Sequence, residues 1–389
     1  MSRHCVMIMA GGTGGHVFPA LSLAAVLRER DCDIVWLGTR AGIEARLVPS
    51  AGIPIEWLEI GGLRGKGIGT LLTAPLRVLR ALAQAIGAMR RHRPRIVVGL
   101  GGYVTGPGGL AAWLTRRPLV IHEQNAVAGF TNRVLAHFAS RVLEAFEGSF
   151  GRTSTRRLFF GKRRPIVAVG NPVRAEFFAL PSPQRRLADR HGALRILVVG
   201  GSQGAQRLNQ VVPAALASLR GRLELQVRHQ TGTRNLEATR AAYAAEGVIA
   251  AVDAFIEDMA AAYAEADLVI CRAGALTVSE LAAAGVAAIF VPFPAAVDDH
   301  QTRNAGFLVE RGAAVMLPER ELSAQRLADE LLRLGSDRAS LLQMAERARS
   351  LARPSSADDV AEICLAVAGL PGSLVAGRRP AETNRGGVA

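Results

Sequence analysis

Two stretches, MAGGTGGHVFPA at residues 9–20 and VVGGSQGAQRLN at residues 198–209, decide the fold that we predict for this chain. Each stretch joins an apolar run to a cluster of glycines and then to a helical pattern, which is typical of the first turn of a Rossmann-like unit. Glycine permits positive φ and close backbone approach, and the helix start that follows offers unpaired N–H groups to an anion. The repeat therefore predicts two α/β domains in tandem, each opened by an anion-binding turn.

Short apolar runs alternate with amphipathic helical stretches on either side of both turns. Such alternation predicts βαβ units, and hence doubly wound parallel sheets that helices cover on both faces. The strands are expected at residues 5–9, 33–37, 96–100, 119–122, 166–169, 195–199, 223–228, 248–252, 268–271 and 286–291. The fold class is therefore α/β, with two Rossmann-like domains.

The domain boundaries follow from residues 171–193, which carry three prolines and clustered charge and so suggest a linker. After residue 322 the pattern is helical without further strands, and the end of the chain is rich in Gly, Pro and Arg. The expected divisions are an N-terminal domain at 1–170, the linker at 171–193, a C-terminal domain at 194–350, a helix at 351–369 that can cross back to the first domain, and a flexible tail at 370–389.

Composition limits the classes of function. The chain has 389 residues, is 49% hydrophobic and carries a net charge of +14, which favours anionic partners. No apolar run reaches the roughly 20 residues that a membrane span needs, and the first residues lack the pattern of a signal peptide. The four cysteines are scattered without a C-x-x-C pair, which argues against disulfides and a zinc site. We expect a soluble protein of a reducing compartment.

The glycine loops favour phosphate over a dinucleotide. After the first loop, position 17 is Val where the dinucleotide fingerprint has Gly, and the second strand ends in Gly38-Thr39-Arg40 without the acid that holds a ribose. A third glycine cluster, at residues 99–109, also follows an apolar strand. Loops at the carboxyl ends of parallel strands share one crevice, so we expect all three clusters to line a ligand site. Ser202 in the second loop can bind a phosphate oxygen or cap its own helix.

Three polar segments complete the candidate site, and each has an alternative structural role. His122-Glu123-Gln124-Asn125 follows a strand directly and can form either a site or a turn. Residues 272–280 open a helix at which N–H groups and Thr277 can hold phosphate oxygens. Glu280 can accept both hydroxyls of a ribose or can complement the helix dipole. The run at 298–304 can bind sugar hydroxyls or cap the next helix.

Seven ordered motifs resemble the MurG family of family 28 glycosyltransferases, from about residue 4 to about residue 365. They are MAGGTGGHVFPA, GGYVTGPGG, HEQNAVAG, GNPVR, GGSQGA, CRAGALTVSELAAAG and DDHQTRNA. The resemblance implies a GT-B fold, in which the two Rossmann-like domains face each other across a cleft. It also implies transfer of GlcNAc from UDP-GlcNAc to the 4-hydroxyl of MurNAc in lipid I, the undecaprenyl-pyrophosphoryl-MurNAc-pentapeptide, giving lipid II and UDP.

The resemblance also assigns roles to individual residues. Ser202 matches a serine beside the donor diphosphate, Glu280 an acid at the ribose, and Gln301 a glutamine that binds GlcNAc hydroxyls. The full set of implied substrate-binding residues is Thr13, Gly14, Gly15, Asn125, Arg174, Ser202, Ile256, Ala275, Leu276, Thr277, Val278, Ser279, Glu280 and Gln301. The sequence departs from the family in a longer and more basic segment at 151–164 and in the variable stretch 294–299, which makes the placement of Gln301 less direct.

An α-linked donor and a β-linked product imply inversion by a single in-line displacement. Such a step needs a general base and preorganised donors for the departing diphosphate. We favour His16 as the base, because its place at a helix start lowers the pKa of the imidazole. Alternatively, His16 donates a hydrogen bond to a phosphate. Glu123 is the second candidate base. No D-x-D pair stands in a suitable place, so we expect neither a metal nor a cofactor.

A membrane-embedded acceptor requires docking on an anionic bilayer, for which a basic surface of the N-terminal domain is suited. In the helix at 71–91 we expect the apolar stripe with Leu76 and Leu79 to pack on the sheet. The docking surface is then the basic face with Arg64, Lys66 and nearby Trp113. The expected location is the cytoplasmic face of the bacterial inner membrane, with cell-wall synthesis and division proteins as further partners.

Four other functions were weighed. A nucleic-acid-binding protein would explain the charge, but no nucleic-acid motif is present and aromatic residues are few, so we expect no nucleic-acid partner. An NAD-dependent oxidoreductase lacks its fingerprint here. A UDP-sugar epimerase on the same fold is the closest enzymatic alternative, and a non-catalytic UDP-binding scaffold remains open.

Overall fold

The computed structural model describes residues 4–61, 68–151, 166–188, 190–201, 204–294 and 299–370. Its strands form a seven-stranded sheet in the order β3-β2-β1-β4-β5-β6-β7 and a six-stranded sheet in the order β10-β9-β8-β11-β12-β13. The strands are β1 (His4–Met9), β2 (Cys32–Gly38), β3 (Ile55–Trp57), β4 (Ile96–Gly99), β5 (Leu119–Glu123), β6 (Arg141–Glu144), β7 (Ile166–Ala168), β8 (Leu194–Val199), β9 (Leu225–Gln230), β10 (Ala251–Asp253), β11 (Leu268–Cys271), β12 (Ala287–Phe290) and β13 (Ala314–Met316). All pairs of neighbouring strands in these ranges are parallel, which confirms the predicted α/β class.

Both sheets reverse their winding beside their first strand. β1 lies between β2 and β4, and β8 lies between β9 and β11. Such a switch point opens a crevice at the carboxyl ends of the strands, where α/β proteins bind ligands. The two glycine-rich turns follow β1 and β8 directly, so each turn lies at the crevice of its own domain.

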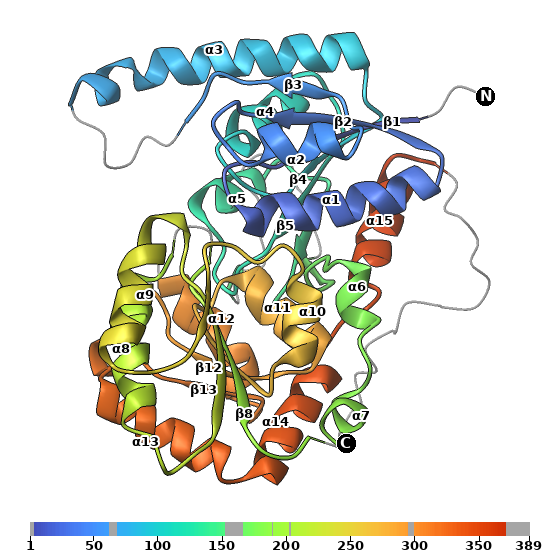
Figure 1. Ribbon diagram of the computed structural model, residues 1–389. Helices are drawn as coiled ribbons and strands as arrows, with labels where there is room; N and C mark the ends of the chain where they lie inside the picture. The colour runs from blue at the N-terminus through green and yellow to red at the C-terminus, as the bar shows by residue number, and fades with distance from the viewer. Residues whose placement is uncertain are drawn as a thin grey trace.

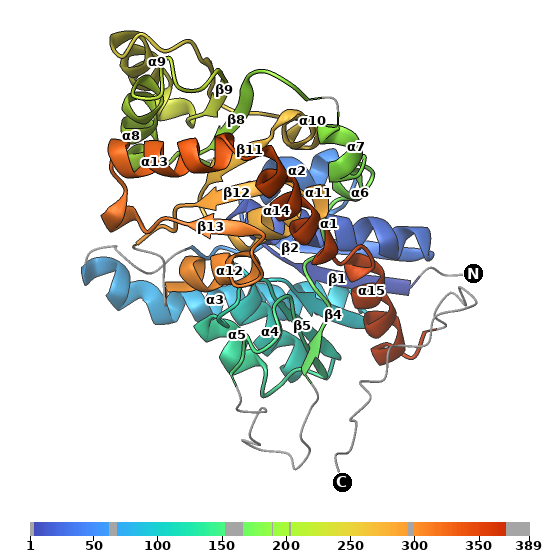
Figure 2. The ribbon, with the colours of Figure 1, turned by 90° about the horizontal axis from the view of Figure 1, so that it is seen from below.

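Helices cover both faces of each sheet, as Figures 1 and 2 show. In β1, Val6 and Ile8 enter one apolar core while Met7 and Met9 enter the other, because successive side chains point to opposite faces. The helices of the first domain are α1 (Gly14–Glu29), α2 (Glu44–Ser50), α3 (Ile68–His92), α4 (Thr105–Leu114) and α5 (Phe130–Leu135). Those of the second are α8 (Gln206–Ala217), α9 (Leu236–Ala245), α10 (Met259–Glu265), α11 (Ala275–Ala284), α12 (His300–Val309), α13 (Ala324–Gly335) and α14 (Arg338–Ser350).

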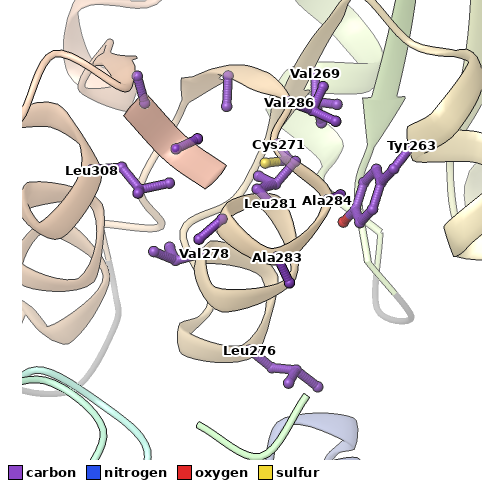
Figure 3. Close-up of a cluster of buried hydrophobic side chains, with 14 of the residues drawn as sticks. Tyr263, Val269, Cys271, Leu276, Val278, Leu281, Ala283, Ala284, Val286 and Leu308 are labelled. Carbon is purple, nitrogen blue, oxygen red and sulfur yellow. The ribbon is translucent and has the colours of Figure 1, made fainter. Parts of the chain in front are cut away.

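Helix α11 packs in the hydrophobic core of the second domain. It begins after the extended N-cap Gly274 and ends at Gly285, whose left-handed conformation (φ 63°) is easily adopted by glycine. Val278 and Leu281 are fully buried in the core shown in Figure 3. This packing fixes the direction of the helix and therefore the place of its N-terminus.

The segment predicted as a linker packs against the second domain. It forms two short helices, α6 (Ala175–Phe178) and α7 (Pro183–Leu187). Phe177 is fully buried, with its ring 5.8 Å from that of Tyr263, and Arg349 of α14 donates to the carbonyl of Phe177 at 3.1 Å. Residues 175–187 are thus a strap that packs on the core of the second domain.

The last described helix, α15 (Ser356–Val367), packs beside α1 of the first domain (Figures 1 and 2). Its Val360 and Cys364 enter the same core as Val6 and Ile8. Arg30, which follows α1, forms an ion pair with Asp358 at 2.6 Å. Of the tail predicted at 370–389, Leu370 is buried in this same core, and residues 371–389 lie outside the described residues.

Some short strands and one face of α3 differ from the prediction. The short edge or near-edge strands β3, β6 and β13 were not predicted, because three or four residues carry little pattern of their own. Leu76 and Leu79 of α3 were expected to face the sheet, but their exposed fractions are 71% and 62%. Ala85, Ala88 and Met89 of α3 are buried in the core, and Leu82 and Ile86 of the predicted stripe pack against it, so the prediction is wrong for Leu76 and Leu79 only.

Candidate functional site

A cavity of about 1420 Å³ lies between the two domains. The first domain contributes the loops after β1 and β5, and the second contributes the loops after β8, β10 and β11. The predicted site residues that line the cavity are Thr13, Gly14, Gly15, His16, Asn125, Arg174, Ile256, Ala275, Leu276, Thr277, Glu280 and Gln301. Ser202 lies outside the described residues.

The first glycine-rich loop rests on Glu44, a fully buried carboxylate at the start of α2. Glu44 Oε2 accepts the N–H of Gly12 at 2.9 Å, and Oε1 accepts the N–H and the hydroxyl of Thr39 at 3.0 and 2.7 Å. A Cβ on Gly11 would lie 2.6 Å from Oε1, so glycine is required there. The negatively charged side chain of Glu44 therefore holds the backbone of this loop in place.

His16 lies in the first turn of α1, half-buried at the cavity wall. Its Nδ1 is 3.2 Å from the carbonyl oxygen of Gly11, which can accept but not donate, so the proton of the neutral ring is on Nδ1 and Nε2 carries the lone pair. Burial lowers the pKa of His16, and the negative charges of Glu123 and Glu44 oppose that shift in part. The ring is therefore neutral at neutral pH and able to accept a proton.

Glu123 ends β5 and is saturated by donors from its own loop. Oε1 accepts the backbone and side-chain N–H groups of Asn125 at 2.9 and 3.1 Å. Oε2 accepts the N–H of Gly129 at 3.0 Å and the Asn132 amide at 2.8 Å. Glu123 does not line the cavity, and this bonding suits a residue that shapes the loop and orients Asn125.

We expected the third glycine cluster to line the ligand site, and this is wrong: the cluster supports the first loop and does not line the cavity. A Cβ on Gly102 would lie 2.3 Å from the carbonyl oxygen of Gly11, and one on Gly101 would lie 2.6 Å from Cδ2 of His16. Both glycines have positive φ, 103° for Gly101 and 86° for Gly102. The cluster therefore lets the loop after β4 approach the His16 ring closely.

Arg174 and Glu280 form the wall of the cavity at the strap. The Arg174 guanidinium lies 5.1 Å from the ring centre of Phe18 on α1 and 4.8 Å from that of Phe177, and it is 3.8 Å from Glu280 Oε1. Burial raises the pKa of Glu280 to about 7, although the charge of Arg174 acts in the opposite direction. Glu280 is therefore a carboxyl group that exchanges its proton near neutral pH.

The start of α11 faces the cavity with some of its residues and the core with others. Ala275, Leu276 and Thr277 line the cavity beside the unpaired N–H groups of the first helical turn. Val278 is fully buried, and the Ser279 hydroxyl donates to the carbonyl of Ala275 at 3.0 Å. The side chains of these two predicted site residues are therefore part of the helix packing.

Two amide side chains of α12 hold loops at the cavity in place. Gln301 Oε1 accepts the N–H groups of Ala273 and Phe293 at 3.2 and 2.9 Å, which leaves its amino group as the part that can donate to a ligand. Asn304 is fully buried: Oδ1 accepts the N–H of Ala126 at 2.8 Å, and Nδ2 donates to the Asn125 Oδ1 at 3.3 Å. Asn304 thus joins the second domain to the Asn125 loop of the first.

The second glycine-rich loop and the segment after β10 lie side by side. Gly200 and Gly201 line the cavity, and Gln230 at the end of β9 bonds to Gly201. Ile256 is buried at 4% exposure while Phe255 is 55% exposed, and both line the same cavity. The arrangement can hold a phosphorylated ligand whose apolar ring lies against residues 255–256.

Sequence reasoning missed Glu44, Gln230 and Asn304. Glu44 and Gln230 bond to the backbone of the glycine loops from a neighbouring helix or strand. The only hint in the sequence is that a tight glycine loop needs a buried polar partner. Asn304 was within a polar run that we identified, but its contact with the first domain depends on how the domains meet. Pairing across domains leaves no local pattern in a sequence.

The described part of the chain shows neither a metal-binding cluster nor a membrane-spanning helix. Within these ranges, no group of three or more His, Cys, Asp or Glu side chains could hold a metal ion. No helix in the same ranges is both long and apolar enough to cross a bilayer. The expectation that no metal or cofactor takes part stays a prediction.

Two domain profiles of one family match most of the chain. The glycosyltransferase family 28 N-terminal domain matches residues 6–144, and the glycosyltransferase family 28 C-terminal domain matches residues 195–360. These ranges contain the two sheets described above, apart from the short strand β7 and the first residues of β1 and β8.

Curated relatives and solved structures agree with this match. The chain is 56% identical over 363 residues to a Nitrosococcus oceani protein and 57% identical over 360 residues to one from Alkalilimnicola ehrlichii, covering 93% and 92% of this chain and 98% of each relative. Both relatives are named UDP-N-acetylglucosamine–N-acetylmuramyl-(pentapeptide) pyrophosphoryl-undecaprenol N-acetylglucosamine transferase. The crystal structure of Acinetobacter baumannii MurG superposes with a TM-score of 0.78 at 42% identity, covering 93% of this chain and 99% of that one. A Listeria monocytogenes UDP-N-acetylglucosamine 2-epimerase structure, at 14% identity, shares the fold alone (TM-score 0.65), covering 94% of this chain and 97% of that one.

Proposed function

This chain belongs to glycosyltransferase family 28, and from that premise we propose that it transfers GlcNAc from UDP-GlcNAc to the 4-hydroxyl of MurNAc in lipid I, giving lipid II and UDP. One observation of the structure carries the proposal. The N-terminus of α1, with His16, and the N-terminus of α11, with Glu280, come from different domains and line the same cavity. A base and an anion site therefore face a shared space, as transfer from a nucleotide to a hydroxyl requires.

The second domain holds the donor. The first turn of α11 offers N–H groups and about half a positive charge to the diphosphate, and the Thr277 hydroxyl adds a further donor. Glu280 accepts the ribose hydroxyls, and the backbone at Ile256 pairs with uracil. The Gln301 amino group binds a GlcNAc hydroxyl, and Ser202 lies beside the diphosphate as the resemblance implies. Arg174 supports Glu280 by its charge.

The first domain supplies the base. His16 Nε2 takes the proton of the acceptor hydroxyl as that oxygen attacks C1 of GlcNAc. The C1–O bond to UDP breaks in the same in-line step, and the electron pair leaves with the diphosphate, so the configuration inverts. Thr13, Gly14, Gly15 and Asn125 line the space where the two sugars meet. The saturated hydrogen bonding of Glu123 favours His16 as base.

The departing diphosphate gains preorganised donors at a helix N-terminus, which is the kind of electrostatic stabilisation that dominates many enzymes. A metal ion is not needed for this task, and we propose that the protein has no obligatory metal ligand. Removal of divalent ions with a chelator is expected to leave the turnover rate within about twofold.

The first domain also offers a surface for an anionic bilayer at the cytoplasmic face of the inner membrane. α3 packs against α4, and α4 packs against α5. These helices expose large apolar side chains next to exposed arginines such as Arg77, Arg116 and Arg133. The exposed apolar residues are Leu76, Leu79, Trp113, Leu114, Phe130 and Val134. Apolar insertion and attraction of about 1 kcal/mol per basic residue then act together. Arg64 and Lys66, which we also expected there, lie outside the described residues.

Binding to vesicles of phosphatidylglycerol tests this docking surface. We expect binding at low salt that weakens at high salt, and a further loss in the double variant Leu76→Ser and Leu79→Ser. Ile249→Ser is the matched control, because Ile249 is 96% exposed on the second domain. Binding that neither salt nor the double variant changes would contradict the proposal. Cell-wall synthesis and division proteins are further proposed partners.

Release of UDP from UDP-GlcNAc, measured with and without a short-chain lipid I analogue, tests the reaction. Release that depends on the acceptor, with a β-linked disaccharide as product, is expected. Turnover of UDP-GlcNAc without acceptor would instead indicate hydrolysis or epimerase chemistry. Tight UDP binding without any turnover would indicate a scaffold.

A further inference from the structure

Gln230 lies on the second strand of the second sheet, beside the edge strand β10. It is the last residue of β9, and in the strand order β10-β9-β8 it pairs with Asp253 on one side and Val199 on the other. The chain after Val199 is the second glycine-rich loop, and the chain after Asp253 leads through Ala254 to residues 255–256. Gln230 therefore stands between two loops that leave the sheet at the same edge.

The side chain of Gln230 bonds to both loops. Oε1 accepts the N–H of Gly201 at 3.0 Å, while Nε2 donates to the carbonyl of Gly201 at 3.1 Å and to that of Ala254 at 3.2 Å. Gln230 is 3% exposed and also lines the cavity. A primary amide offers an acceptor and a donor side by side, so it continues the strand ladder beyond the point where the backbones part.

The two loops serve opposite ends of one ligand, and this step rests on the proposed function. The loop at Gly201 meets the diphosphate, and residues 255–256 meet the uracil. UDP can bind to both at once only if their separation matches the length of the nucleotide. Holding the two loops at a fixed separation lowers the entropic cost of binding.

We propose that Gln230 is a positioning residue that sets the register between the diphosphate loop and the uracil segment. It acts through Gly201 and Ala254, and its own contribution is the alignment of two half-sites. Loss of the amide therefore affects a ligand that spans both half-sites far more than a ligand that occupies one of them.

Calorimetric titration of three ligands tests this role. Uridine probes the uracil segment, inorganic pyrophosphate probes the glycine loop, and UDP spans both. In Gln230→Met, which keeps the volume and removes the bonds, we expect UDP affinity to fall at least tenfold, or about 1.4 kcal/mol. Uridine and pyrophosphate are each expected to lose less than threefold. Gln226→Met, an exposed glutamine on the same strand, is the matched control and is expected to change none of the three.

Gln230→Glu is the second variant. A carboxylate can still accept the Gly201 N–H but cannot donate to the two carbonyls, so the same selective loss of UDP affinity is expected even if the methionine variant folds poorly. Unchanged UDP affinity, or an equal loss for all three ligands, would overturn the proposal. Acceptor-dependent turnover of the wild-type protein is measured separately. Its absence would reject the proposed function, whereas the three-ligand comparison judges Gln230 alone.

Discussion

The two glycine-rich loops share a sequence pattern and differ in what braces them. The first rests on the carboxylate of Glu44, which accepts the Gly12 N–H at 2.9 Å. The second rests on the amide of Gln230, which accepts the Gly201 N–H at 3.0 Å and also donates to the Gly201 carbonyl. The same sequence pattern therefore forms two loops, one supported by a charged side chain in the first domain and one supported by a neutral side chain in the second.

The difference in charge matches a difference in chemistry. The carboxylates of Glu44 and Glu123 both act to raise the pKa of His16, so the base lies in a negative field. Such a field favours the imidazolium that forms and the positive charge that develops on the transferred sugar. The second loop, beside the start of α11, is supported by the uncharged side chain of Gln230. A diphosphate can therefore bind there without repulsion from a supporting carboxylate.

The largest expected effect is on the base. In His16→Ala we expect kcat to fall by about 10²- to 10⁴-fold, the usual contribution of a general base, while the KM for UDP-GlcNAc stays within about threefold. Wild-type kcat should rise with pH through the pKa of His16, which burial holds below 6.5, and the variant should lose this limb. His137→Ala, an exposed histidine of the same domain, is the control. Loss of UDP-GlcNAc binding with kcat intact would assign His16 to the phosphate.

The next effect concerns Glu280 on the opposite side of the cavity. In Glu280→Gln we expect UDP affinity to fall about 10- to 100-fold, because hydrogen bonds to a charged group contribute about 1.5–3 kcal/mol. The pKa of Glu280 is about 7, so wild-type affinity for UDP should increase as pH rises toward 7 and then level off, and the variant should show no such rise. An unchanged pH profile in the variant would contradict a role for this carboxyl at the ribose.

Glu280 also makes stability depend on pH. Its folded-state pKa of about 7 exceeds the ordinary value of 4.5, so its contribution to stability is complete below pH 4.5 and is lost as pH rises to 7. The glutamine variant should therefore lose less free energy of unfolding than the wild type between these two pH values. Urea denaturation at pH 5 and pH 8 measures the difference.

The fold was predictable because its pattern is local. Apolar runs that alternate with helical stretches predicted β1, β8 and β11, and the glycine turns identified the first strand of each domain. Leu76 and Leu79 were placed wrongly, since the periodicity of α3 shows an apolar stripe but not which stripe meets the sheet. Ala85 and Ala88 of α3 share a core with alanines of α4. Small residues such as alanine contribute little to the hydrophobic periodicity of a helix.

The site was predictable as far as its residues lie on strand ends and helix starts. His16, Glu280 and Gln301 meet in one cavity as expected. Val278 and Ser279 belong to the same motif but pack inward, because successive helical residues point in different directions. The braces Glu44 and Gln230 depend on contacts between elements, which a single sequence does not display.

A further prediction concerns Glu44, which supports the first glycine-rich loop. In Glu44→Gln one oxygen becomes an amino group, which must face either the Gly12 N–H or the donors of Thr39. An unpaired buried donor costs about 1–3 kcal/mol, and we expect that loss in the free energy of unfolding, measured by urea denaturation. Glu29→Gln, an exposed glutamate at the end of α1, should change stability by less than about 0.5 kcal/mol. Full stability of Glu44→Gln would show that the loop does not need a charged brace.

The smallest expected effect concerns Asn304, at the contact between the two domains. Asn304→Ala removes the bonds to the Ala126 N–H and the Asn125 amide, each worth about 0.5 kcal/mol at the low end of the usual range, so we expect kcat/KM for the acceptor to fall about 3- to 10-fold. UDP affinity should change by less than about twofold, because the nucleotide half of the site lies within the second domain. Thr302→Ala on the same helix, whose hydroxyl bonds to Asp299 and not to the first domain, is the control. Asn304 also donates to the carbonyl of Ala273 at 3.1 Å. An equal loss of UDP affinity in Asn304→Ala would therefore mean that its amide supports the loop at Ala273 and not the contact between the two domains.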